Sequence, residues 1–295
     1  MSTKNSNTDN KNKIQGRKKL DGGSFISGLT AGTGFTSIVP MTYAQKAGIL
    51  KRKDLDLNIP EEVIDAHNSN ARRMLSTRGF VEDTRNIPGI GADNALYNPN
   101  MNRTVYLDFK NNFLFRRAGP HMQPSPTDLN TRMVRVGKGV YSSPEILSHE
   151  LGHSLQSTPL LAAYGAGRIL NGLSVPILAG VGSIRCKDPE KQNKIDRYAK
   201  YGVGIGTLAG LLNVGVELDA SYKGYKMLRD SGLMTPDAPL SKKLGPFVGI
   251  PTYLAVAAAP AAAYYGSRYL PEKIKTLYNK LKNRKTQESQ APKGE

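Results

Sequence analysis

The segment "SHELGHSLQS", Ser148–Ser157, carries two of the chain's four histidines, four residues apart. Positions i and i+4 of a helix lie on one face, so His149 and His153 can bind one metal ion together. Glu150, directly after the first histidine, lies about 100° further round the helix and can hold a water bound to that metal. The pattern predicts a zinc site in which Glu150 is the general base of peptide-bond hydrolysis.

A third protein ligand must come from further along the chain. No Asp, Glu or His occurs between Ser154 and Lys187, which excludes zinc sites whose third ligand follows shortly after the second histidine. Glu217 stands at the end of an apolar stretch, where a carboxylate is costly unless it is paired or metal-bound. We therefore expect Glu217 as third ligand and Asp219 as the group that orients one histidine. The alternative is that both acids only solvate a helix end.

Two apolar stretches connect the histidines to this acid. Pro159–Ile184 leads away from the histidine helix and Tyr201–Val216 leads back, so together they predict a helical hairpin that returns the third ligand to the site. The intervening acids Asp188, Glu190 and Asp196 would lie at the far end of the hairpin, roughly 25–40 Å away at 1.5 Å per residue.

The histidine segment itself is typical of a helix. Ser142 or Ser143 can cap its start, Pro144 suits its first turn, and Pro159 ends it. Gly152 inside this helix costs about 1 kcal/mol relative to alanine, which indicates that another part of the chain approaches closely there.

Other elements around the site follow from periodicity. The apolar spacing of "IPEEVIDAHNSNARRMLSTRGF" predicts a helix that ends near Gly79. "TVYLDF", Thr104–Phe109, alternates with period two, and "RMVRVG", Arg132–Gly137, is a second predicted strand. Either Thr104–Phe109 or Met133–Val136 is expected to pair with an extended substrate.

Composition limits the classes of protein to consider. The single Cys186 excludes an intramolecular disulfide and a CxxC metal site. The net charge of +17 suits an anionic partner, either nucleic acid or an acidic membrane surface. No zinc-finger, RNP or P-loop pattern accompanies this charge and the chain has no Trp, so we expect no specific nucleic-acid partner.

Three apolar stretches favour a membrane. Besides the two stretches of the hairpin, Gly245–Ser267 has no charge over 23 residues, and small residues such as Gly202, Gly206 and Gly210 recur at helical spacing. The alternative is a set of buried helices in a soluble domain, which the mean hydropathy of -0.42 favours. The tail after Leu270 predicts a basic amphipathic helix that lies on an anionic membrane or packs against the domain.

The expected fold class is mainly α with a small β element, built from a zincin-like HExxH helix and the apolar helical hairpin. In chain order, the expected parts are a disordered basic N-terminus (1–21), a weak apolar segment (22–45), a zincin-like domain (46–158), the hairpin (159–216), the third-ligand helix and loop (217–244), an apolar helix (245–268) and a basic amphipathic tail (269–295).

Several of these segments together resemble the YugP-type neutral zinc metallopeptidases, which are membrane-associated enzymes of bacteria. The resemblance covers about Tyr43 to Leu233 and lies in "ARRMLSTRGF", "IPGIGADNALYNPNMNRTVYL", "GVYSSPEILSHELGHSLQ" and "VELDASYKGYKMLRDSGLM". It implies two histidine ligands, a catalytic glutamate, Glu217 as third ligand and membrane helices between the two motifs. Leu96 stands where the family usually has a histidine, Lys110–Val136 is an insertion, and the 22–45 segment is more polar than in the family.

These observations predict a membrane-associated zinc metalloendopeptidase, multi-pass or peripheral, that uses Zn²⁺ and acts on a peptide or protein substrate. The rival interpretation is a non-catalytic membrane or envelope protein whose zinc helix is structural or degenerate. A basic, soluble nucleic-acid binder is the second rival.

Overall fold

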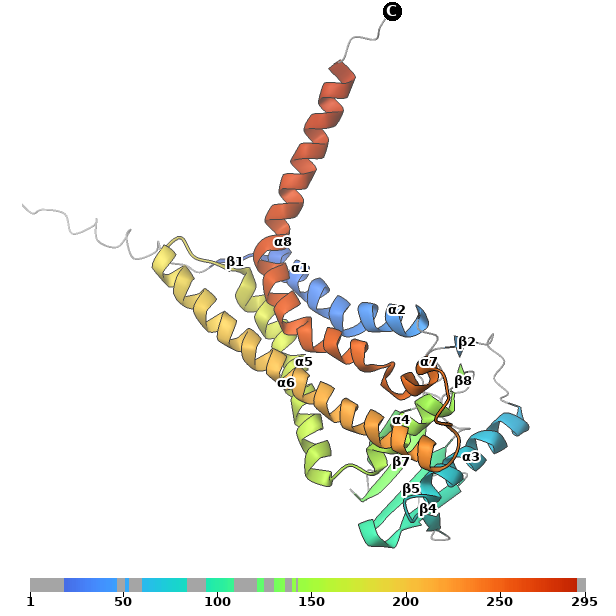
Figure 1. Ribbon diagram of the computed structural model, residues 1–295. Helices are drawn as coiled ribbons and strands as arrows, with labels where there is room; N and C mark the ends of the chain where they lie inside the picture. The colour runs from blue at the N-terminus through green and yellow to red at the C-terminus, as the bar shows by residue number, and fades with distance from the viewer. Residues whose placement is uncertain are drawn as a thin grey trace, which may run out of the picture. The chain divides into compact units, whose positions relative to one another are not determined.

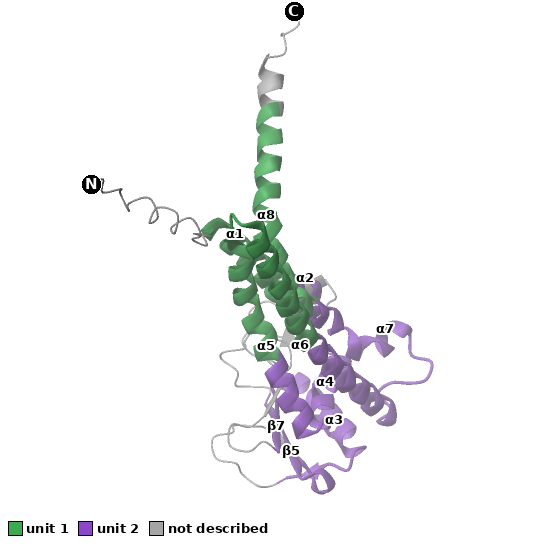
Figure 2. Ribbon diagram, turned by 90° about the vertical axis from the view of Figure 1, so that its left-hand side faces the viewer, with its two compact units in different colours: residues 1–38, 168–210, 255–295 green, residues 39–167, 211–254 purple. Residues whose placement is uncertain are grey.

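The computed structural model describes residues 19–46, 51–52, 60–83, 94–108, 121–124, 130–135, 140–141 and 143–290 (Figure 1). It is mainly helical with a small mixed sheet, as the composition and periodicity predict. The chain forms two compact units: unit 1 contains residues 1–38, 168–210 and 255–295, and unit 2 contains residues 39–167 and 211–254 (Figure 2). The disorder predicted for the N-terminus falls on residues 1–18, outside the described ranges, whereas Lys19–Leu20 forms a short strand.

Unit 2 contains the sheet. Its strands are β3 (Val81–Glu82), β4 (Asn94–Asn98), β5 (Arg103–Asp108), β6 (His121–Pro124) and β7 (Thr131–Arg135), in the order β3-β4-β5-β7-β6. β5 and β7 run parallel, with Tyr106 opposite Met133, and the other neighbours are antiparallel. β5 and β7 correspond to the two predicted strands. The expectation that one of them pairs with a substrate is wrong, because both are interior strands with a neighbour on each side.

Unit 2 also contains helices and short connecting elements. They are α2 (Val39–Lys46), α3 (Glu61–Ser76), α4 (Pro144–Ser154), the C-terminal half of α6 (Pro189–Asp230) and α7 (Leu240–Lys243), with 3₁₀ turns η3 (Pro99–Met101) and η4 (Gly245–Phe247) and the two-stranded ladder of β2 (Lys51–Arg52) and β8 (Val140–Tyr141). Leucine and methionine dominate the core, which includes Met74, Leu75, Leu107, Leu147, Leu151, Met227 and Leu228.

α3 shows why this sequence is helical. Glu61 and Glu62 lie in its first turn and Arg73 in its last, which suits the helix dipole. Its buried residues recur at helical spacing and face the core. The chain turns away at Gly79, whose φ of +72° lies in the left-handed region that glycine adopts without strain.

α4 is shorter than predicted. Ser143 stands at its N-cap position and Pro144 in its first turn, but the helix ends at Ser154. Pro159 lies instead in the first turn of α5 (Thr158–Ser183), where a missing N–H costs nothing. The capping role considered for Ser142 falls outside the described residues.

Unit 1 is a helical assembly. It contains α1 (Gly22–Thr33), the π-helical turn η2 (Gly34–Ile38), most of α5, the N-terminal half of α6 and most of α8 (Ile250–Gln290), with the short ladder of β1 (Lys19–Leu20) and β9 (Ile184–Arg185). α5 and α6 form the predicted hairpin, in which Asn171 Nδ2 donates to Gly206 O at 2.9 Å.

α6 differs from its prediction in one respect. It is a single helix of 42 residues that begins at Pro189, so Glu190 and Asp196, which were expected at the far end of the hairpin, lie within this helix. Glu217 consequently lies inside a helix rather than at its end. Asp188 accepts hydrogen bonds from the backbone of the first turn, and Asp196 pairs with Arg268 within unit 1 at 2.8 Å.

Two helical runs are long and apolar enough to cross a membrane: α6 and Gly245–Asn283, which includes most of α8. Only 39% and 28% of their apolar windows are buried, whereas a core helix of a soluble protein is mostly buried. The α5 stretch does not reach this threshold among the described residues.

Candidate metal centre

Two glycines bring the backbones of α4 and α6 into contact. A Cβ atom at Gly152 would lie 2.1 Å from the Ala220 carbonyl oxygen, and one at Gly224 would lie 2.4 Å from the Ser148 carbonyl oxygen. Any side chain at either position would therefore push the two helices apart. This contact confirms the close approach expected at Gly152, and it brings the turn that carries Glu217 against the turn that carries the histidines.

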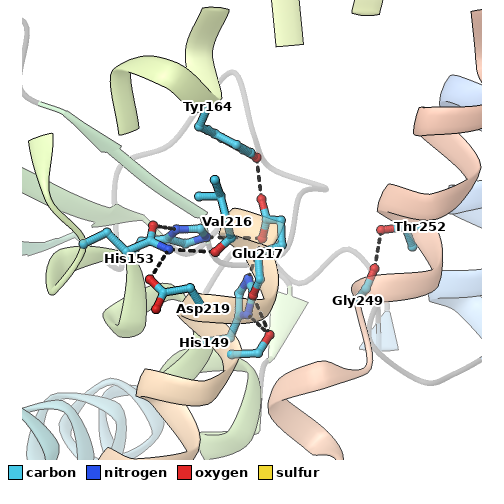
Figure 3. Close-up of polar contacts among 10 residues, drawn as sticks. His149, His153, Tyr164, Val216, Glu217, Asp219, Gly249 and Thr252 are labelled. Carbon is cyan, nitrogen blue, oxygen red and sulfur yellow. Dashed lines mark hydrogen bonds and ion pairs between the residues drawn. The ribbon is translucent and has the colours of Figure 1, made fainter. Parts of the chain in front are cut away.

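Three predicted ligands meet at this crossing. Glu217 Oε2 lies 3.0 Å from His149 Nε2 and 3.3 Å from His153 Nε2 (Figure 3). All three side chains are buried, and one ligand atom from each lies within 4.8 Å of the others, close enough to hold a metal ion. Zinc bonds of about 2.0–2.2 Å in a tetrahedron separate neighbouring ligand atoms by about 3.3 Å, so the observed separations fit this arrangement.

Hydrogen bonds outside this group determine which nitrogen of each imidazole is free. Ser221 Oγ donates to the Glu217 carbonyl oxygen at 2.8 Å, so it must accept the proton of His149 Nδ1, 2.9 Å away. A metal-ligating histidine characteristically gives its other N–H to such a partner. The Nε2 lone pair of His149 is thereby directed toward Glu217.

His153 is held in the same way by a glutamine. Gln156 Nε2 donates to Val216 O at 2.7 Å and to Asp219 Oδ2 at 2.9 Å, which leaves its Oε1 as acceptor for His153 Nδ1–H at 2.7 Å (Figure 3). Both imidazoles therefore direct their Nε2 atoms to one point, and each Nε2 offers a lone pair there when its ring is neutral. In contrast to the prediction, Asp219 therefore does not contact a histidine directly. It orients Gln156, and Gln156 in turn orients His153.

Tyr164, in the first turns of α5, is one of the site residues that sequence reasoning missed. Its hydroxyl donates to Glu217 Oε1, the carboxylate oxygen that does not face the imidazoles (Figure 3). Its ring centroid lies 6.3 Å from that of His153. Ser221 was also missed, although its position four residues after Glu217 on the same helix face is a usable signal.

Burial and charge act in opposite directions on His153. Burial lowers the pKa of this imidazole, but the hydrogen bond and charge of Glu217, with smaller effects of Glu150 and Gln156, outweigh burial and raise the pKa to about 9. A proton and a metal ion therefore compete for the same Nε2 atom.

Glu150 lies beside this group rather than in it. Its side chain is half-buried, and its carboxylate interacts electrostatically with His153 and with the Tyr253 phenol. Tyr253 interacts in turn with Glu217 and Tyr164. The predicted base is thus close enough to the candidate ligands to influence His153 electrostatically.

The chain matches no family model, no curated protein and no solved structure.

Proposed function

We propose that this protein is a zinc-dependent metalloendopeptidase with His149, His153 and Glu217 as metal ligands. The observation that carries the proposal is the convergence of two Nε2 lone pairs and one carboxylate oxygen, each held by a separate hydrogen bond. Two imidazoles and a carboxylate are a ligand set that zinc uses in hydrolytic enzymes, with a fourth position left for water or substrate.

Each residue has a distinct role in the proposed reaction. A bound zinc ion supplies Lewis-acid chemistry, which lowers the pKa of water and polarises a peptide carbonyl. The Glu150 carboxylate takes the proton of the attacking water and gives it to the nitrogen of the leaving amine. Tyr164 holds Glu217 Oε1, which leaves Oε2 to face the metal position.

The substrate is proposed to bind as an added strand at the edge of the sheet. Among the described strands, β6 lies at an edge of the sheet, and it contacts α4, the helix of the two histidines. An extended peptide that pairs with β6 would be bound through its backbone, a mode that gives affinity without a strict sequence requirement.

We further propose that the protein is embedded in a membrane. The support is the low burial of the two apolar helical runs. A second support is the exposure of large apolar side chains on the helices of unit 1. These include Ile26, Ile169, Leu173, Ile177, Ile205 and Leu208.

The decisive experiment is the Glu150→Gln variant. It removes the base and keeps the ligands, so peptide hydrolysis should fall by about 10²–10⁴-fold while bound zinc stays unchanged. Hydrolysis is measured on a fluorogenic peptide mixture, and zinc by elemental analysis of the purified chain. Full activity in this variant would remove Glu150 from the mechanism. A wild-type chain that binds one zinc but hydrolyses nothing would support the non-catalytic rival.

A further inference from the structure

The last part of α8 exposes its side chains to the surroundings. Every residue from Glu272 to Asn283 is exposed, and this segment projects away from the other helices of unit 1 (Figure 2). The amphipathic helix therefore forms as predicted, but it does not pack against the domain. Its exposed apolar side chains are large: Ile274 is 54% exposed, Leu277 59%, Tyr278 64% and Leu281 53%.

These side chains form one stripe with lysines on both of its sides. At 100° per residue, Leu270, Ile274, Leu277, Tyr278 and Leu281 fall within about one quarter of the helix circumference. Lys273 and Lys280 lie along one edge of this stripe, and Lys275 and Lys282 lie along the other. Asn279 lies on the opposite face. Lysines in such positions can reach the headgroups of a bilayer while the stripe enters its apolar boundary.

A proline marks the point where the segment leaves the packed part of α8. Pro271 has no N–H to donate to the Ser267 carbonyl oxygen, and Arg185 donates to that oxygen instead at 3.1 Å. Arg185 also donates to the Arg268 carbonyl oxygen at 3.2 Å. The hydrogen bonds from Arg185 hold α8 in place just before Pro271, and the helix can bend at this proline.

We propose that the segment Leu270–Lys282 binds the surface of an anionic lipid bilayer through this stripe. Charge decides between this occupant and a second copy of the chain. Residues 270–285 contain six Lys or Arg and a single acid, Glu272, so two copies joined along the stripe would bring like charges together. An anionic surface attracts the same charges and receives the apolar side chains in its interface.

The absence of Trp from the chain makes a clean test possible. The full-length protein is prepared as Leu277→Trp, which reports on the stripe, and as Asn279→Trp, its matched control on the opposite face. Each is reconstituted into vesicles of phosphatidylcholine alone and of phosphatidylcholine with phosphatidylglycerol. The Leu277→Trp emission should shift to the blue only with the anionic lipid, and the Asn279→Trp emission should not shift.

Two further measurements isolate the contribution of charge. The shift of Leu277→Trp should be lost when Lys273, Lys275, Lys280 and Lys282 are all changed to Gln, and at about 1 M salt, where the Debye length is about 3 Å. A shift that appears equally without anionic lipid and grows with protein density would indicate self-association and overturn the proposal. Emission that is the same in all vesicles would also overturn the proposal.

Discussion

The two units differ in the size of the side chains that they bury. Unit 2 encloses large residues such as Met74, Leu107 and Met227. Unit 1 encloses mostly small ones, among them Ala179, Ala259 and Ala263, and exposes large ones such as Ile177 and Leu208. The first arrangement is that of a domain stabilised by the removal of apolar surface from water. The second is the arrangement expected if the helices lie in lipid, where the solvent is as apolar as leucine and close packing of small residues holds helices together.

The same difference appears in the use of glycine. In unit 1, Gly28 and Gly32 of α1 lie against Ala263, and each admits no Cβ without a clash. Through these contacts α1 packs into the helical assembly, although its sequence is only weakly apolar. In unit 2, Gly152 and Gly224 allow α4 and α6 to approach so closely that His149, His153 and Glu217 come within reach of one another.

The largest expected effect is the loss of zinc affinity when Glu217, the candidate ligand on α6, is removed. Glu217→Ala should weaken zinc binding by at least about 100-fold, because loss of a partner outside the ligand set already costs 10–100-fold. The affinity is measured by competition with a chromophoric chelator. Glu190→Ala, which removes an exposed acid from the same helix, is the control and should bind zinc as the wild type does. Equal affinities in the two variants would place the third ligand elsewhere.

A lysine on the surface of unit 1 tests whether this surface faces lipid. Leu208 is 67% exposed in unit 1, and Leu240 is 68% exposed in unit 2. If only the first faces a bilayer, Leu208→Lys should cost about 3–4 kcal/mol of membrane insertion, and Leu240→Lys should cost almost none. The readout is the fraction of chain that stays in the membrane after an alkaline wash. Identical behaviour of both variants would remove the distinction between the units.

The close contact between α4 and α6 is tested by two Gly→Ala substitutions, one at the contact and one away from it. Gly152→Ala should lower the free energy of unfolding by about 1–3 kcal/mol and weaken zinc binding, because its Cβ would meet the backbone of Ala220. Gly215→Ala has open space around its Cβ and should stabilise α6 by about 0.5–1 kcal/mol. Both are followed by denaturant unfolding with and without zinc. The comparison fails if Gly152→Ala is neutral.

The smallest expected effect is on zinc affinity when the Tyr164 hydroxyl, which donates to Glu217, is removed. Tyr164→Phe should raise the zinc dissociation constant by about 10-fold, at the low end for a partner outside the ligand set. It should also change the visible spectrum of the cobalt-substituted protein, since Glu217 is then free to bind through both oxygens. Tyr222→Phe, an exposed tyrosine of unit 2, is the control. An unchanged spectrum in both would mean that this hydrogen bond does not restrain the carboxylate.

Sequence reasoning reached the centre of the site but not its surroundings. The pairing of His149 with His153 follows from the helix period alone. Glu217 follows from the absence of acids between Ser154 and Lys187 and from the hairpin, whose far end holds the next acids along the chain. Tyr164 was not predictable, because its contact depends on how α5 starts after the short turn that follows α4. The continuity of α6 was missed because the charged residues near its start obscured the apolar period that defines its later turns.

The length of α6 has a mechanical consequence. A continuous helix is a stiff rod, so a slide along its axis moves every residue by the same amount. Zinc coordination accepts deviations of only about 0.2 Å in bond length. A metal ion bound by Glu217 would therefore respond to an axial shift that begins anywhere along the 42 residues of α6.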